Sequence, residues 1–70
     1  MIGAAFEPLR LLTISEAAEY INTTPRFIRR RLAKREVPFH KLGGLVRINQ
    51  NDLDEYVARC RVPTGARQKT

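Results

Sequence analysis

Two helix start signals stand close together in this sequence, and they constrain its fold more than any other feature. Thr13-Ile14-Ser15-Glu16 has the pattern of a capping box, in which the side chains of Thr13 and Glu16 each accept a hydrogen bond from the other residue's backbone N–H. Thr24 is a second favourable N-cap, and Pro25 follows at the first helical position, where a missing N–H costs nothing. Asn22, between the two signals, tolerates the left-handed conformation of a helix end. The sequence therefore predicts two helices joined by a tight turn.

Apolar residues recur at helical spacing in both predicted helices. The first helix has one apolar face, formed by Ile14, Ala17, Ala18 and Ile21. The second helix, which we expect to end near Arg35, has a buried edge at Ile28 and Leu32. Its opposite face is mainly cationic and consists of Arg26, Arg29, Arg30 and Ala33, with Lys34 at the margin. Two amphipathic helices with so short a connection are typical of a helix-turn-helix.

A hairpin is expected after Val37-Pro38, with strands at residues 39–42 and 45–48 around Gly43-Gly44. Two registers are open. A two-residue loop pairs Leu42 with Leu45 and leaves both on the face of His40 and Arg47. A three-residue loop pairs Leu42 with Val46, directs Leu42, Val46 and Ile48 inward, and directs Lys41 and Arg47 outward. We favour the second register because it buries three aliphatic side chains and exposes both cations.

A third helix is expected after Asn49, which is followed by Asp52 at capping distance. Its apolar stripe consists of Leu53, Tyr56, Val57 and Cys60, so we expect Cys60 to be packed or half-buried. The predicted fold is mainly α with a small β-hairpin, a winged helix-turn-helix in the order helix, helix, hairpin, helix. We expect a flexible N-terminal arm at residues 1–10, the domain at residues 11–60, and a basic disordered tail at residues 61–70.

Charge and size limit the classes of function. The 70 residues carry 13 Lys and Arg against 7 Asp and Glu, and the net charge of +6 favours nucleic acid, an anionic membrane surface or an acidic protein as partner. A chain this short has little room for an enclosed substrate pocket, and it contains no nucleophile–base constellation, so we expect no enzyme. His40 and Cys60 are too few for a zinc site, and we expect no metal and no other cofactor. We find no signal peptide and no membrane span, and therefore expect a cytoplasmic protein without membrane contact.

The strongest functional signal is a basic run in the second helix. Six of the ten positions from 26 to 35 are basic, namely Arg26, Arg29, Arg30, Arg31, Lys34 and Arg35. Like charges four residues apart repel by a few tenths of a kcal/mol per pair, a cost that bound phosphates reverse. Arginine suits bidentate contacts with guanine or with phosphate oxygens. The run therefore indicates double-stranded DNA as the partner.

Geometry assigns roles to individual residues. Arg26, Arg29 and Arg30 come early on the outward face, where a recognition helix presents side chains to base edges. Lys41 and Arg47 flank the glycine tip of a wing that touches the adjacent backbone or enters the minor groove. We also expect a phosphate site at the start of the second helix and contacts with the DNA backbone from its later cations. The full candidate set is Thr24, Pro25, Arg26, Arg29, Arg30, Arg31, Lys34, Lys41, Gly43, Gly44 and Arg47. We expect Phe27 to pack against the hairpin rather than to contact a thymine methyl.

Residues 11–57 resemble MerR-like and excisionase-type domains. The stretch Leu11-Leu12-Thr13-Ile14-Ser15-Glu16-Ala17-Ala18-Glu19-Tyr20-Ile21 is similar to their opening, in which Thr-x-x-Glu-Ala-Ala precedes the turn. Lys41-Leu42-Gly43-Gly44-Leu45-Val46-Arg47-Ile48 and Asn51-Asp52-Leu53 are similar to their wing and closing helix. The resemblance implies that the second helix and the wing read DNA, through Arg26, Arg29, Arg30, Lys41 and Arg47. The sequence departs from the family's pattern at Asn22, where glycine is frequent, and in its arginine-rich second helix, which leaves the base preference open.

Three functions follow from the resemblance and the charge. MerR-type regulators dimerise through a long C-terminal helix and carry an effector domain, whereas this sequence ends in a short polar segment. Stand-alone domains of this size resemble phage-type excisionases, which bind neighbouring sites, bend DNA and direct an integrase towards excision, with cooperative self-association on the DNA. We therefore expect an excisionase, a recombination directionality factor with an integrase as partner. The alternatives are a small phage or plasmid transcriptional regulator and, from another class, a basic protein-interaction module.

Overall fold

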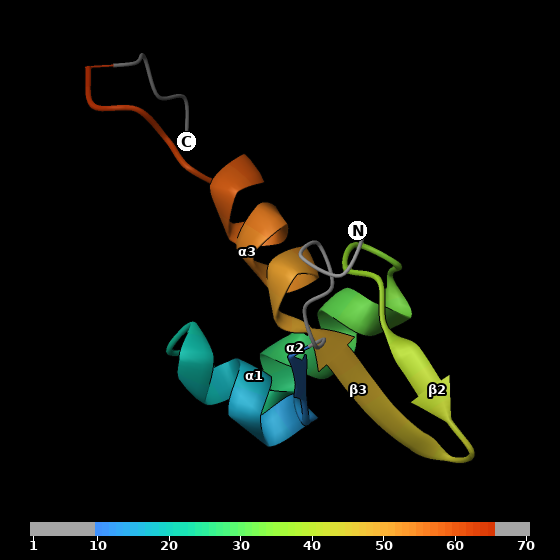
Figure 1. Ribbon diagram of the computed structural model, residues 1–70. Coiled ribbons are helices and arrows are strands. Elements are labelled where there is room, and N and C mark those ends of the chain that lie inside the picture. The colour runs from blue at the N-terminus through green and yellow to red at the C-terminus, as the bar shows by residue number, and fades with distance from the viewer. Residues whose placement is uncertain (1–9, 66–70) are drawn as a thin grey trace, which may run out of the picture.

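Three helices and three short strands follow one another in the part of the chain that the structure, a computed structural model, describes: residues 10–65 (Figure 1). Their order is β1 (Leu11–Leu12), α1 (Ile14–Tyr20), α2 (Pro25–Ala33), β2 (His40–Leu42), β3 (Leu45–Asn49) and α3 (Gln50–Arg59). The predicted arm, apart from residue 10, and residues 66–70 of the predicted tail lie outside the described residues. The three predicted helices and the predicted hairpin are all present.

Both helix start signals act as predicted. The N–H of Glu16 donates to Thr13 Oγ1 (3.0 Å) and the N–H of Thr13 donates to Glu16 Oε1 (2.9 Å), which completes the capping box of α1. Thr24 Oγ1 accepts from the N–H of Phe27 (3.1 Å), and Pro25 occupies the first helical position of α2. An N-cap of this kind contributes about 1 kcal/mol. The start of each helix is therefore set by the sequence around it.

Both helices end in the same way, through a residue with positive φ. Asn22 has φ 59, and the N–H of Thr23 reaches back to the carbonyl of Ala18 (2.7 Å). Arg35 also has φ 59, and the N–H of Glu36 reaches back to the carbonyl of Arg31 (2.9 Å). These are Schellman motifs, which satisfy the last carbonyls of a helix. Because Arg35 leaves the helical conformation, α2 ends at Ala33, earlier than predicted.

The hairpin adopts the two-residue loop, so the register favoured from the sequence is wrong. β2 and β3 pair Leu42 with Leu45, Lys41 with Val46 and His40 with Arg47. Gly43 has φ 63, and the N–H of Gly44 donates to the carbonyl of Leu42 (2.8 Å) across it, a tight turn whose positive φ glycine adopts more readily than other residues. Leu42 is consequently 49% exposed instead of buried. The local turn geometry, rather than the count of buried aliphatic residues, determines the register.

A third strand, β1, was not predicted from the sequence. Leu11 pairs with Asn49 and Leu12 with Ile48, so the antiparallel sheet has the order β1-β3-β2. The N–H of Gln50 also donates to the carbonyl of Arg10 (2.8 Å). The strand that precedes α1 therefore pairs with the end of the hairpin and holds the start of α3 in place.

The core lies where α1, α2, the sheet and the first turns of α3 meet. Seven residues are buried in it: Ala17, Ala18, Ile28, Leu32, Val37, Ile48 and Leu53. Small residues on α1 allow α2 to pack closely. Of the predicted stripe on α3, only Leu53 is buried and Tyr56 is half-buried, while Val57 is exposed. The expectation that Cys60 is packed was wrong, because the thiol is exposed.

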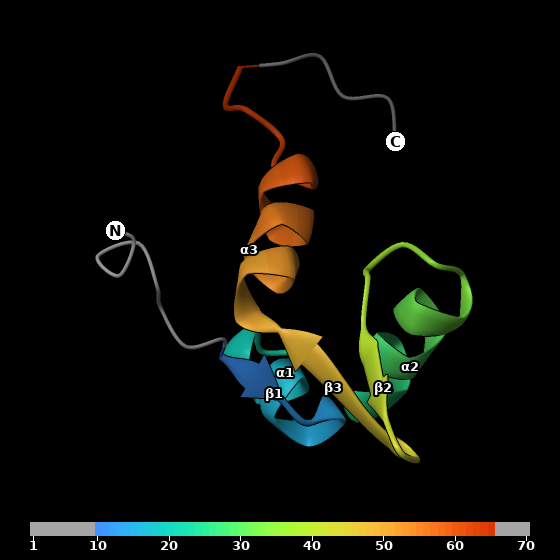
Figure 2. The ribbon, with the colours of Figure 1, turned by 45° about the vertical axis from the view of Figure 1, so that its right-hand side comes forward.

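The last turn of α3 extends away from this core (Figure 1). Figures 1 and 2 show α3 leaving the domain on one side and the tip of the β2–β3 hairpin projecting on the other. The small core is filled before α3 ends, so Val57 remains 43% exposed and Cys60 is exposed. The molecule thus has a hairpin end and an α3 end, with α1 and α2 between them.

Candidate nucleic-acid interface

The outward face of α2 carries a row of cations without acidic partners. Arg26, Arg29, Arg30 and Lys34 are exposed, and the only ion pair in residues 10–65 joins two other residues, Arg31 and Glu36. Burial of Ile28 and Leu32 fixes the rotation of the helix and so directs these cations away from the core. Their charges remain available to an anionic partner.

Arg31 does not join this row. Its Nη1 lies 3.1 Å from Glu36 Oε1, its guanidinium lies 4.9 Å from the ring centroid of Phe27, and its side chain is only 20% exposed. Phe27 is half-buried and packs on the core, as expected, where it lines an interior space together with Ile48 of the hairpin and Tyr56 of α3. The structure therefore places Arg31 on the side of α2 that faces α3.

On the same side of α2, one long side chain from the end of α3 reaches the loop that follows α2. Arg59 donates from Nη2 to the carbonyl of Glu36 (3.3 Å), and its guanidinium lies 5.9 Å from the ring of Tyr56. Burial and a hydrogen bond with Cys60 raise the pKa of Tyr56 above its usual value of 10.0. The hydrogen bond from Arg59 therefore joins the loop after α2 to α3, away from the exposed cations of α2.

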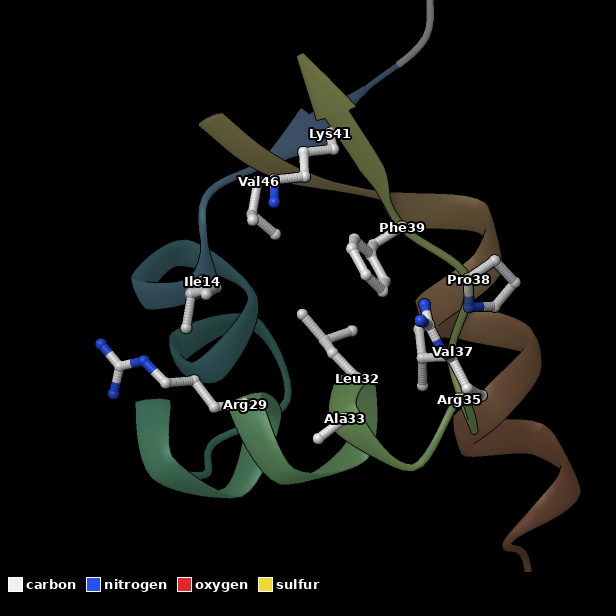
Figure 3. Close-up of a pocket in the computed structure, with 10 residues that line it drawn as sticks. All are labelled: Ile14, Arg29, Leu32, Ala33, Arg35, Val37, Pro38, Phe39, Lys41 and Val46. Carbon is white, nitrogen blue, oxygen red and sulfur yellow. The ribbon is translucent and has the colours of Figure 1, made fainter. Parts of the chain in front are cut away.

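An open groove of about 710 Å³ separates α2 from the hairpin (Figure 3). Its apolar floor includes Leu32, Phe39 and Val46, and the cations Arg29, Arg35 and Lys41 lie around its rim. Arg35 was not among the predicted candidates. Its guanidinium carbon lies 5.6 Å from the centroid of the Phe39 ring. Its membership of the basic run was the sequence signal that pointed to it.

The observed register separates the two wing cations. Lys41 pairs with Val46 and lies at the rim of the groove, on the side of α2. Arg47 shares the other face of the hairpin with Leu42 and Leu45, is half-buried, and donates from Nη1 to the carbonyl of Val46 (2.8 Å). Lys41 therefore continues the cationic surface of α2, whereas Arg47 does not, and the expectation that both point outward on one face was wrong. Gly43 and Gly44 are exposed at the tip, with open space around both.

The start of α2 has few free N–H donors for a phosphate. Thr24 and Pro25 are exposed, as expected for a surface that approaches DNA. However, Thr24 Oγ1 already accepts from Phe27, the Thr24 carbonyl accepts from the N–H of Ile28 (3.1 Å), and Pro25 has no N–H. The N–H of Arg26 is the first-turn donor left for a phosphate.

Two short helices joined by a tight turn, an exposed cationic second helix and an adjacent antiparallel hairpin define a DNA-binding protein with a winged helix-turn-helix architecture. The chain belongs to the helix-turn-helix domain family, whose profile matches residues 11–61. This family binds DNA sequence-specifically and includes excisionase-like proteins. No curated protein and no solved structure matches the chain.

Two further properties concern residues 10–65 alone. None of the helices there is long and apolar enough to cross a membrane. The same residues contain no group of three or more His, Cys, Asp and Glu side chains that is able to hold a metal ion.

Proposed function

We propose that this chain is an excisionase-type DNA-binding protein without catalytic activity. It binds neighbouring double-stranded sites with α2 in the major groove, bends the DNA, and directs an integrase towards excision. Copies of the chain on adjacent sites assist one another, and the protein acts in the cytoplasm of a bacterial host, on its DNA.

The observation that carries the DNA-binding part is the unpaired cationic surface made by α2 and the rim of the groove. It is formed by Arg26, Arg29, Arg30, Lys34, Arg35 and Lys41, all of them exposed. Each phosphate that such a cation neutralises releases condensed counterions, which is the main source of affinity for duplex DNA. Arg29 and Lys41 lie on opposite sides of the groove and can therefore contact the two sides of one sugar–phosphate backbone.

The exposed apolar residues at the α3 end support the partner in the proposal. Val57 is 43% exposed and Val62 60% exposed, and they lie beyond the core on the α3 side of the molecule. A protein bound to DNA through α2 and the hairpin presents this end away from the duplex (Figure 2). An integrase or a neighbouring copy then has an apolar surface to contact while the DNA-binding surface is occupied.

The DNA-binding part is tested by selecting duplexes from a random library and titrating the selected sequence. We expect a sequence-specific footprint and an affinity that falls steeply with salt. A chain that binds acidic proteins equally well, and duplex DNA without sequence preference, is instead the basic protein-interaction module.

The recombination part is tested with the integrase encoded by the same genetic element. Excision and integration are assayed on plasmid substrates, with and without the intact chain. We expect the chain to raise excision and to lower integration. A footprint at a single promoter site, with neither direction of recombination changed, indicates the transcriptional regulator instead.

A further inference from the structure

We propose that Leu42 and Leu45, at the tip of the hairpin, form an apolar wedge that enters the minor groove beside the site of α2 and unstacks a base step. The inference rests on the proposed DNA binding and adds to it the part of the protein that bends the duplex. It assigns to the wing an apolar contact in place of a purely electrostatic one.

The two leucines form a pair that the fold leaves uncovered. The register places them directly opposite each other, where paired side chains lie about 4.5–5.5 Å apart at Cβ. Leu42 is 49% exposed and Leu45 57% exposed, and neither belongs to the core or to the partly buried residues packed on it. A single exposed leucine is ordinary, but two that face each other beside a projecting turn make a continuous apolar surface.

The turn between them makes the leucines the first side chains that a duplex meets. Gly43 and Gly44 carry no side chain, and there is open space around both. The hairpin tip projects from the domain on the side away from α3 (Figures 1 and 2). When the tip approaches DNA, the glycine backbone therefore passes first and the leucine pair follows at once.

The width of the minor groove explains why an apolar wedge is needed. The minor groove of B-DNA is about 6 Å wide, and two paired strands alone are about 4.8 Å apart before side chains are added. A ribbon of this kind enters only if the groove opens. Proteins that open it insert apolar side chains, including Leu, between base steps and kink the duplex towards the major groove.

Charge favours DNA over a second copy of the chain as the occupant. The pair is flanked by Lys41 on one face of the hairpin and by Arg47 on the other, and the described residues near the tip include no acid. A second copy would have to bring its own cations close to these, because the net charge of the chain is +6. A duplex supplies phosphates on both sides of its minor groove.

The test compares the intact chain with a Leu42→Ala/Leu45→Ala variant on a duplex selected by the intact chain. Bending is measured by energy transfer between dyes at the two ends of the duplex, and unstacking by the fluorescence of 2-aminopurine placed at successive steps beside the footprint. Two variants serve as controls. Val57→Ala/Val62→Ala removes similar exposed apolar surface at the α3 end, and Arg29→Ala weakens binding through α2.

We expect the leucine variant to bind roughly tenfold more weakly, which corresponds to about 1.4 kcal/mol. At saturation its duplex should show energy transfer close to that of free DNA and no 2-aminopurine signal. Arg29→Ala should lose affinity but keep the full bend at saturation, and the α3-end variant should match the intact chain on a single site.

Three results overturn the inference. The first is an intact chain that binds its site without bending it, and the second is a leucine variant with an unchanged bend. The third is a leucine variant that loses only cooperativity on a duplex with two sites, because the pair then contacts a second copy. In all three cases DNA binding itself stands; if the intact chain selects no duplex at all, the proposed function fails together with this inference.

Discussion

Two of the described arginines, Arg31 and Arg59, make contacts that set them apart from the exposed arginines on the outward face of α2. Arg31 contacts Glu36 and the ring of Phe27, both near it in the sequence, and Arg59 of α3 donates to the carbonyl of Glu36, which joins the segment after α2 to α3. Arg29 and Arg30 are exposed, and neither forms an ion pair within residues 10–65. Although they are neighbours in the sequence, Arg30 and Arg31 therefore belong to different groups, because adjacent positions on a helix point about 100° apart.

Single substitutions distinguish these groups. Arg29→Ala or Arg30→Ala should reduce the binding free energy that discriminates between bases by about 1–3 kcal/mol, at the base pair that the arginine reads. The thermal midpoint should be unchanged. Arg31→Ala should lower the thermal midpoint and leave the base preference as it was. Footprints and melting curves of the three variants check this; unchanged footprints for both Arg29→Ala and Arg30→Ala would show that α2 does not read the bases.

Arg35 occupies a backbone conformation that favours glycine. Its φ of 59 completes the Schellman motif at the end of α2, and a residue with a Cβ pays about 1 kcal/mol in this region. Arg35→Gly should therefore raise the free energy of unfolding by up to about 1 kcal/mol, less what the lost contact with Phe39 contributed. Urea denaturation measures the change. As the matched control, Arg29→Gly in the middle of α2 should lower stability by about 1 kcal/mol.

At the scale of elements, the hairpin shows how far the sequence predicts the structure. The strands and the glycine turn were predicted because Gly43-Gly44 is a strong local signal. The register was predicted wrongly, because burial of aliphatic side chains favoured the pairing of Leu42 with Val46, whereas the structure pairs Leu42 with Leu45 and leaves both exposed. β1 was missed because its partner, β3, lies far along the sequence and the strand has only two residues, which is too short for a visible alternation.

The helices follow their local signals more closely than their apolar patterns. The caps at Thr13 and Thr24 form as predicted, and Asn49 caps α3 by accepting from the N–H of Asn51 (2.8 Å), one residue earlier than the predicted spacing. The apolar stripe on α3 predicted burial wrongly at Val57 and Cys60, because a domain of this size has too small a core to cover the whole helix. Of the candidate interface residues, the cations of α2 were placed correctly on the outside except Arg31, whose side chain turns back to Phe27 on its own helix and to Glu36 in the loop that follows. Arg31 also lines the interior space that Leu53 and Tyr56 of α3 complete, and the local pattern of α2 does not contain the position of α3.

Substitutions in the hairpin test the observed register. Ile48 is completely buried, so Ile48→Ala should destabilise the domain by about 2–5 kcal/mol. Leu42→Ala should change stability by less than about 0.5 kcal/mol, as expected for an exposed site. Both values come from urea titrations followed by circular dichroism. A large loss for Leu42→Ala would indicate the alternative pairing of Leu42 with Val46.

The contact between α1 and α3 should be visible in alkaline solution. The hydroxyl of Tyr20 donates to Asp54 Oδ1 (2.8 Å), and this hydrogen bond raises the pKa of Tyr20 above its usual value of 10.0. Because the pKa is higher in the folded state, the contribution to stability is complete below pH 10 and is lost as the pH rises above it. Thermal midpoints measured from pH 8 to 11 should fall more steeply for the intact chain than for Tyr20→Phe. Parallel curves would mean that this contact contributes nothing.

At the scale of the whole molecule, the two ends of the domain have different surfaces. The α2 face and the rim of the groove are cationic, the hairpin tip is apolar, and the α3 end exposes Val57 and Val62. A small domain with this arrangement can hold a duplex on one side and leave the other side to a protein partner. The proposed wedge and the proposed partner contact both require bound DNA, so both depend on the first of these surfaces, the cationic one.

The most direct test that this cationic surface binds DNA is the salt dependence of binding to the selected duplex. It is measured for the intact chain and for the triple variant Arg26→Gln/Arg29→Gln/Arg30→Gln. We predict a slope of log K against log salt of about −3 to −5 for the intact chain, reduced by about 0.9 for every phosphate contact removed. The control Arg10→Gln/Arg61→Gln removes exposed charges outside α2 and should retain the slope of the intact chain. If the α2 variant shows the same slope and footprint as this control, the cationic face of α2 is not the surface that binds DNA.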